Sequence, residues 1–381
     1  ITTAGQNVAI GSRALDADTT GLGNVAIGRD ALGSNIDGNS NTGIGQQTLA
    51  GNTTADNNTA VGAYAMQTNS TANNNTAVGY NSLCDNTTGS CNVAVGTSAL
   101  ATNTTGKCNI ALGETALTAN TTGCQNVAIG QASLAANTTG IKNTAIGRLA
   151  LTTNTTGGTN VAIGQQSLQL LTTASNNTAV GVLALKANTT GSENTALGIC
   201  ASGSNTTGTC NVALGRNALY TTTTGAKNIA IGAAALFSNT TGTGNTAVGD
   251  QALYTNTTAD ENTAVGSCAL KLNTTGSSNV SVGARNLDAN TTGTNNVSVG
   301  RSGMGSNTTG ANNTSIGQGS LGLNTTGFQN AAVGANSLEA NTTAANNTAV
   351  GFCAGNKNTT GTSNVFLGTC AGEKTTTGSN N

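Results

Sequence analysis

The nine cysteines are the side chains of this 381-residue chain with the most accessible chemistry. Cys353 and Cys370 are 17 residues apart, and so are Cys91 and Cys108. If 17 residues make one coil of a stack of strands, equivalent Cα atoms lie about 4.8 Å apart, within the ~4.4–6.8 Å that a disulfide spans. We therefore predict that each pair can form a disulfide that links neighbouring coils.

Cys200 and Cys210 are a third candidate pair, because both fall within one 17-residue segment. Cys268 has no neighbouring cysteine, and an odd total leaves at least one thiol free or bonded to another chain. The alternative is that the cysteines are simply small residues tolerated at the surface or in the core. Mass analysis after alkylation under non-reducing conditions distinguishes the two interpretations.

The common pairings of a nucleophile with a base are missing. The chain has no His and no Trp, and its carboxylates never recur at positions that would pair an acid with a base. The Gly- and Asp-rich nonapeptides that bind calcium in some solenoids are also missing. We predict a protein that is not an enzyme and that uses no metal or cofactor.

The segment Asn-Thr-Thr-Gly recurs along the chain and allows two interpretations. Asn-Thr-Thr is a glycosylation sequon, so an outward Asn could carry a glycan, although glycans about 4.8 Å apart would crowd one another. An inward Asn would instead form a ladder of amide hydrogen bonds, which we favour slightly. The candidate glycosylation sites are Asn86, Asn103, Asn120, Asn137 and Asn154.

The two threonines of the same segment would form regular columns on a stack of coils. A flat and rigid threonine array can order water, so ice binding is a further hypothesis. Threonine is also an ordinary solvent-facing strand residue, and the neighbouring positions vary in size and charge.

One 17-residue repeat positions all these residues, from Asn7 to Asn381, without an insertion or deletion. We number its places from its first Asn: place four is Ile, Val or Leu, place five is Gly and place nine is mostly Leu. Seventeen residues are too few for a strand–helix–strand unit, and the density of Gly, Thr and Asn disfavours helix. We predict an all-β parallel β-solenoid (a β-roll or β-helix) without helices, with one coil per repeat and about 22 coils. Residues 1–381 are expected to form one continuous array, as a segment of a longer protein.

The invariant small and aliphatic places are expected to pack inside the coil, and the variable polar places to face water. Val95 and Leu112 at place four, with Leu100 and Leu117 at place nine, represent the predicted core columns. The Ala-Leu pair at places eight and nine is expected to begin a second short extended piece. Asn at place one is predicted to form an amide ladder and Gly at place five a tight turn; representatives are Asn92, Gly96, Asn109, Gly113, Asn126 and Gly130.

The bulk composition limits the classes of partner. Thirteen Lys and Arg against fourteen Asp and Glu give a net charge of −1 without a basic run, so we predict no nucleic-acid binding. No stretch approaches 18 consecutive apolar residues, so we predict no membrane span in this segment. A single coil buries too few aliphatic side chains to offset the ordering of its backbone, which predicts self-association into a fibre or homotrimer.

The run Asn-Val-Ala-Ile-Gly resembles the head repeats of trimeric autotransporter adhesins; it occurs at 7–11, 24–28, 126–130 and 160–164. Extended by Ala-Leu and Asn-Thr-Thr-Gly, it also looks like repeats of bacteriophage-type tail fibres and bacterial surface fibres. The adhesin resemblance implies a left-handed β-roll that trimerises and binds host matrix proteins or other surfaces. The period of 17 is longer than that of the adhesin repeat, and no heptad stalk or anchor domain is present in these residues.

Three functions are therefore expected, in order of preference. The first is the non-catalytic shaft of an extracellular fibre or cell-surface adhesin, with a repetitive surface that binds a carbohydrate or another surface, or carries glycans. The second is the shaft of a virion tail fibre, and the third is ice binding through the threonine columns.

Overall fold

The computed structural model describes residues 5–381, which form 22 strands of three residues each and no helix. The chain divides into two compact units between Ser192 and Glu193. The strands of the first unit are β1 (Val8–Ile10), β2 (Val25–Ile27), β3 (Thr42–Ile44), β4 (Thr59–Val61), β5 (Thr76–Val78), β6 (Val93–Val95), β7 (Ile110–Leu112), β8 (Val127–Ile129), β9 (Thr144–Ile146), β10 (Val161–Ile163) and β11 (Thr178–Val180). The strands of the second are β12 (Thr195–Leu197), β13 (Val212–Leu214), β14 (Ile229–Ile231), β15 (Thr246–Val248), β16 (Thr263–Val265), β17 (Val280–Val282), β18 (Val297–Val299), β19 (Thr314–Ile316), β20 (Ala331–Val333), β21 (Thr348–Val350) and β22 (Val365–Leu367).

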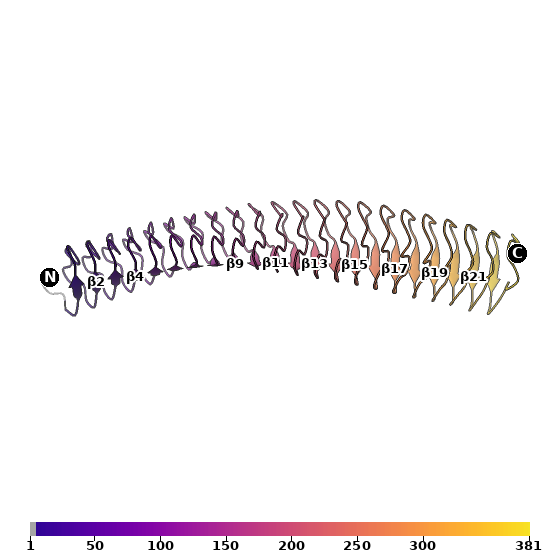
Figure 1. Cartoon of the computed structure of the whole chain (residues 1–381), viewed down its shortest axis with the longest axis horizontal. Helices are drawn as coiled ribbons and strands as arrows, with labels where there is room; N and C mark the ends of the chain where they lie inside the picture. The colour runs from indigo at the N-terminus through magenta and orange to yellow at the C-terminus, as the bar shows by residue number, and fades with distance from the viewer. Residues whose placement is uncertain (1–4) are drawn as a thin grey trace. The chain divides into compact units, whose positions relative to one another are not determined.

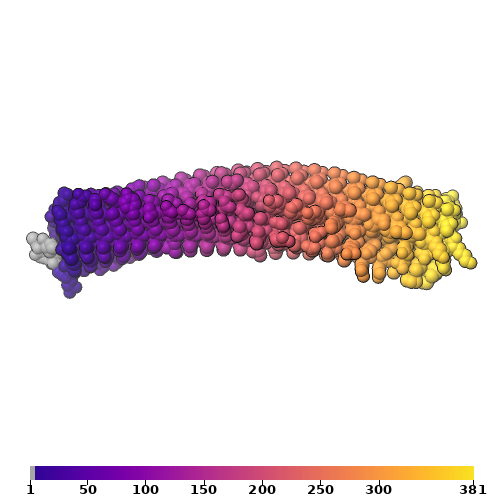
Figure 2. All heavy atoms as spheres, in the orientation of Figure 1, coloured from indigo at the N-terminus to yellow at the C-terminus, as the bar shows by residue number. Residues whose placement is uncertain are grey.

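Within each unit, every strand pairs in parallel with the strand of the next coil. The register joins equivalent places, so Ala94 of β6 lies opposite Ala111 of β7, and Ser281 of β17 lies opposite Ser298 of β18. Figure 1 shows these arrows side by side in successive coils, and Figure 2 shows side chains in rows that repeat from coil to coil. The predicted all-β parallel solenoid with a 17-residue coil is confirmed.

The core of each coil is thinner than the repeat pattern predicted. Leu100 and Leu117 at place nine are completely buried, and so are Ala94 and Ala111 at place three. Successive side chains of a strand point to opposite faces, so an inward place three turns places two and four outward. The apolar core therefore consists of small residues, mostly Ala, at places three and eight packed with the leucine column of place nine.

The prediction that place four forms a core column is wrong. Val95 is 37% exposed, and Leu112 is only half-buried. An invariant aliphatic residue was interpreted as a buried one, but here it lies on the outer side of the sheet. The second extended piece expected at Ala-Leu is also absent from the described residues, because places six to eleven form turns.

Gly at place five is required for two reasons. Gly96 has φ +132°, in the region that side chains rarely adopt, and a Cβ built on it would lie 2.7 Å from the carbonyl carbon and oxygen of Gly113. Left-handed backbone also occurs at places seven, nine and seventeen, where most residues are not glycine; Leu100 at place nine has φ 53°. Each coil therefore holds several residues in a conformation that the neighbouring coils must stabilise.

Candidate functional site

The most distinctive surface of the molecule is the outer face of the sheet, formed by places two and four. We call these side chains the outer sheet face. Place four is aliphatic in every coil, place two is Val, Ile, Thr or once Ala, and neither place ever carries a charge. Large apolar side chains that are more than a third exposed on this face include Val8, Ile10, Ile44, Val78, Val95, Ile110 and Ile163 in the first unit and Leu197, Ile229, Ile231, Val265, Val297, Val299, Ile316, Val350, Val365 and Leu367 in the second.

Hydrogen bonds between coils hold the strands of this face in register. The N–H of Val93 donates to the carbonyl of Asn109 at 2.9 Å, and the N–H of Asn109 donates to Oδ1 of Asn92 at 2.9 Å. The Asn92 Nδ2 donates to the carbonyl of Gly106, also at 2.9 Å. Asn92 and Asn109 are completely buried, so the place-one amides form a ladder that fixes the start of each strand.

The place-twelve asparagines form a second buried ladder. Asn103 Nδ2 donates to Asn86 Oδ1 at 2.8 Å and to the carbonyl of Gly106 at 3.0 Å. The proposed glycosylation sites are therefore wrong for the folded coil, because a glycan needs an accessible Nδ2 and these nitrogens are enclosed and hydrogen-bonded. All five candidate asparagines are completely buried: Asn86, Asn103, Asn120, Asn137 and Asn154.

The two threonines that follow this asparagine have different environments. Thr104 Oγ1 at place thirteen donates to the carbonyl of Thr121 in the next coil at 3.0 Å, and the Thr104 side chain is half-buried. Thr105 at place fourteen is exposed. The paired threonine columns on which the ice-binding hypothesis depended are therefore reduced to a single water-facing column.

The cysteines lie in several different columns, and all nine are thiols in the structure. Cys353 and Cys370 occupy place seven of adjacent coils, whereas Cys200 and Cys210 occupy places seven and seventeen of one coil. Cys210 Sγ lies 3.3 Å from Glu193 Oε2, in the place-seventeen column. The disulfides predicted from the sequence stay predictions.

Cys84 is the one buried thiol among the nine, with 7% of its surface exposed. Burial, together with the negative charge of Asp85, raises the pKa of the Cys84 thiol to about 11. Since the thiolate is the nucleophile, Cys84 is expected to be unreactive at neutral pH.

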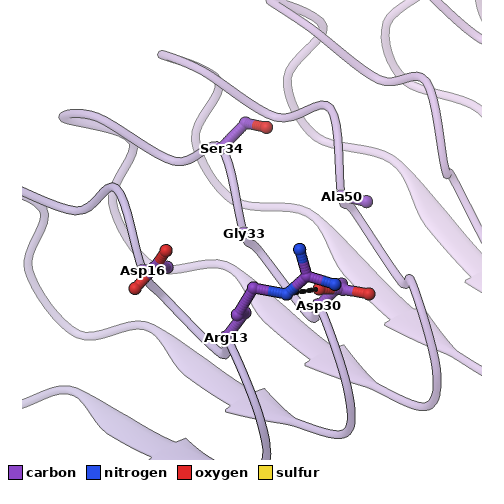
Figure 3. A pocket seen from close by; sticks show the side chains of 6 residues that line it. All are labelled: Arg13, Asp16, Asp30, Gly33, Ser34 and Ala50. Carbon is purple, nitrogen blue, oxygen red and sulfur yellow. Dashed lines mark ion pairs between the residues drawn. The ribbon is translucent and has the colours of Figure 1, made fainter.

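A shallow depression of about 230 Å³ lies between the first coils of the first unit; it is lined by Arg13, Asp16, Asp30, Gly33, Ser34 and Ala50. Arg13 Nε and Asp30 Oδ1 form an ion pair at 2.8 Å across two coils, as Figure 3 shows. Within residues 5–381, no group of three or more His, Cys, Asp or Glu side chains is placed to hold a metal ion.

Sequence reasoning missed the outer sheet face, although one signal for it was present. Place three is almost always Ala, between two larger side chains such as Val93 and Val95. When the middle residue of a short strand is always small, that residue is expected to face the narrow core. Its larger neighbours then face outward, because successive side chains of a strand alternate in direction.

The stacked strands and amide ladders define the class of the chain: it is a parallel β-solenoid repeat protein. No protein-family model matches the sequence, and no curated protein matches it either. Among residues 5–381, no helix has the length and apolarity needed to cross a membrane.

Proposed function

We propose that the chain is a non-catalytic structural shaft that self-associates with further copies along the outer sheet face. The observation that carries this proposal is the absence of any charge from places two and four through every coil. All 27 charged residues, 13 basic and 14 acidic, lie elsewhere in the repeat. Solubility alone does not explain an exposed place that stays aliphatic in every coil, as place four does.

The size of the face supports a stable interface. Each coil presents two side chains, many of them exposed by more than a third, such as Val78 at 37% and Ile44 at 38%. Each unit therefore presents on the order of 1,000 Å² of mostly apolar surface, compared with the ~800 Å² per partner that standard interfaces bury. The largest apolar patch on an ordinary monomer is only about 300–600 Å².

The margins of the face have the character of an interface rim. Place six, just beyond the turn glycine, carries charged residues such as Arg29 and Glu114 as well as the exposed aromatic residue Phe352, and place seventeen carries Lys142 and Glu193. A polar rim around an apolar centre is the common arrangement in protein–protein interfaces. A second copy of this chain is the partner that fits, because its own outer sheet face has the same chemistry and repeats with the same spacing.

The setting we propose is an extracellular fibre or adhesin at a cell surface, with the shaft of a virion appendage as the alternative. The resemblance of the repeat to adhesin heads and tail fibres supports both. A repetitive, ladder-bonded fold supports a mechanical role, since each coil depends only on its immediate neighbours.

The test is the mass of the assembly in solution, measured by sedimentation and light scattering at micromolar concentration. Ile44→Lys together with Val78→Lys places two charges on the outer sheet face of the first unit without entering its core. The expected result is an oligomeric parent chain and a lower mass for this variant, because a buried lysine in an apolar interface must be desolvated.

The matched control replaces two exposed place-fourteen residues of the same coils, as Thr54→Lys with Thr88→Lys. This control should keep the parent mass, and circular dichroism should show that both variants are folded. A monomeric parent chain would overturn the proposal, and so would equal dissociation of the control.

A further inference from the structure

Cys353 and Cys370 are held in equivalent positions by the backbone of two adjacent coils. Their φ angles are 52° and 55°. The Cys353 N–H donates to the carbonyl of Ala335 at 3.0 Å, and the Cys370 N–H donates to that of Phe352 at 2.9 Å. Two residues with one conformation, related by one coil, have equivalent atoms about 4.8 Å apart.

Cys91 and Cys108 repeat this arrangement in the first unit, at place seventeen. Their φ angles are 60° and 59°, and both side chains are exposed. The Cys91 N–H donates to the carbonyl of Asn73 at 3.2 Å, and the Cys108 N–H to that of Ser90 at 3.1 Å. The chain therefore holds two in-register dithiols that solvent can reach.

This spacing is longer than a disulfide prefers. Cβ atoms joined by a disulfide are usually about 3.5–4.5 Å apart, so closing the bond would require the two coils to move slightly closer at this point. A metal–thiolate bond is about 2.3 Å long, so a linear sulfur–metal–sulfur bridge spans about 4.6 Å. Two sulfurs related by one coil therefore lie at about the separation that a single bridging ion spans.

We propose that Cys353 with Cys370, and Cys91 with Cys108, are two-coordinate thiolate sites for a soft monovalent cation of the Cu⁺ type. Soft thiolate ligands select Cu⁺ over harder ions, and closed-shell Cu⁺ accepts linear coordination by two sulfurs. Binding releases up to two thiol protons per site and changes no oxidation state. The proposal does not rest on the shaft function.

The test is an anaerobic titration of the reduced full chain with Cu⁺, in competition with a chromophoric Cu⁺ chelator. The expected result is two tightly held ions per parent chain, one per Cys370→Ser chain and none per chain that carries both Cys370→Ser and Cys108→Ser. X-ray absorption of the loaded parent should show two sulfur ligands per ion.

Cys268→Ser is the matched control, because Cys268 also occupies place seven, with φ 57°, but Gln251 and Arg285 occupy that place in the adjacent coils. This variant should still hold two ions. A parent chain that cannot compete with the chelator would overturn the proposal. So would an equal loss in the control, or three sulfur ligands per ion.

Discussion

Phe366→Ala is expected to open the coils of β21 and β22, because one ring replaces two leucines of the core. Place three is Phe only at Phe366, and place nine is Gly at Gly355 and Gly372. A Cβ built on Gly355 would lie 2.5 Å from Phe366 Cδ2, and one built on Gly372 would also overlap the ring. Phe366 is 4% exposed, so its ring fills the space of the missing leucine side chains.

Removing the ring leaves a cavity that no neighbour can fill, and burial losses of this kind cost about 3–5 kcal/mol. The cost should appear locally, since a solenoid coil is stabilised by its nearest neighbours. The Gly355 N–H donates to the carbonyl of Ala371 at 2.8 Å, so its hydrogen exchange reports on these coils. Exchange of this amide should accelerate by about a hundredfold to several thousandfold.

The control is the triple variant Phe366→Ala, Gly355→Leu and Gly372→Leu, which restores the alanine and leucines of the common repeat. The φ angles of Gly355 and Gly372 are 58° and 68°, close to the 53° that Leu100 adopts at the same place. The triple variant should therefore regain most of the protection from hydrogen exchange. Gly355→Leu or Gly372→Leu alone, with Phe366 kept, should clash with the ring. Unchanged exchange in Phe366→Ala, or a triple variant no better protected than Phe366→Ala, would refute the reasoning.

Three further predictions concern single places of the coil. Gly96→Ala should lower the free energy of unfolding by about 1–3 kcal/mol or more, because it combines a positive φ with a backbone clash. A Cβ on Gly106 also meets close contacts, but Gly106 has no positive φ and other coils carry Ala at that place, so Gly106→Ala should cost less. Thermal unfolding compares the two, and equal costs would contradict this account. Asn103→Ala should cost about 1–3 kcal/mol in denaturant unfolding by leaving buried ladder partners unsatisfied, and a neutral result would argue against the ladder. Cys84 should be alkylated more slowly than exposed Cys91 at pH 8. Its pKa rises from 9.0 to about 11 on folding, so the folded chain holds the proton more tightly, and the stability that this contributes is present below pH 9 and lost as pH rises through 11. Mass spectrometry of the alkylated chain, and unfolding measured across that pH range, check both expectations.

The period of the repeat was sufficient to predict the solenoid, but not the direction of each side chain. Leu100 occupies a mostly aliphatic place and Val95 an invariantly aliphatic one, and residue type alone cannot separate a core column from an apolar outer face. A strand of three residues shows only one inward position, too few for an alternating pattern to be legible. The left-handed backbone of Leu100 had no signal either, because leucine rarely adopts it.

Other residues stood out in the sequence, but their contacts in the fold could not be deduced from it. The Asn-Thr-Thr segment fits a glycosylation sequon or an amide ladder, with a slight preference for the ladder, and the hydrogen bonds of Asn103 decide for the ladder. Phe366, Gly355 and Gly372 look like three unrelated exceptions to the repeat. Contacts between adjacent coils show that they belong together, because the Phe366 ring occupies the space that leucine side chains at positions 355 and 372 would fill.

The in-register contacts between coils also determine how such a gene can change in length. A duplication or loss of 17 codons adds or removes one whole coil. Each remaining place-one asparagine, such as Asn92, still lies beside an equivalent asparagine in the next coil. A single inserted codon in a strand would turn the small inner residue outward and interrupt both ladders. Where one coil fills the core of another, as Phe366 does beside Gly355, the two must be inherited together. Recombination can therefore lengthen most of the array freely, but not at these coupled coils.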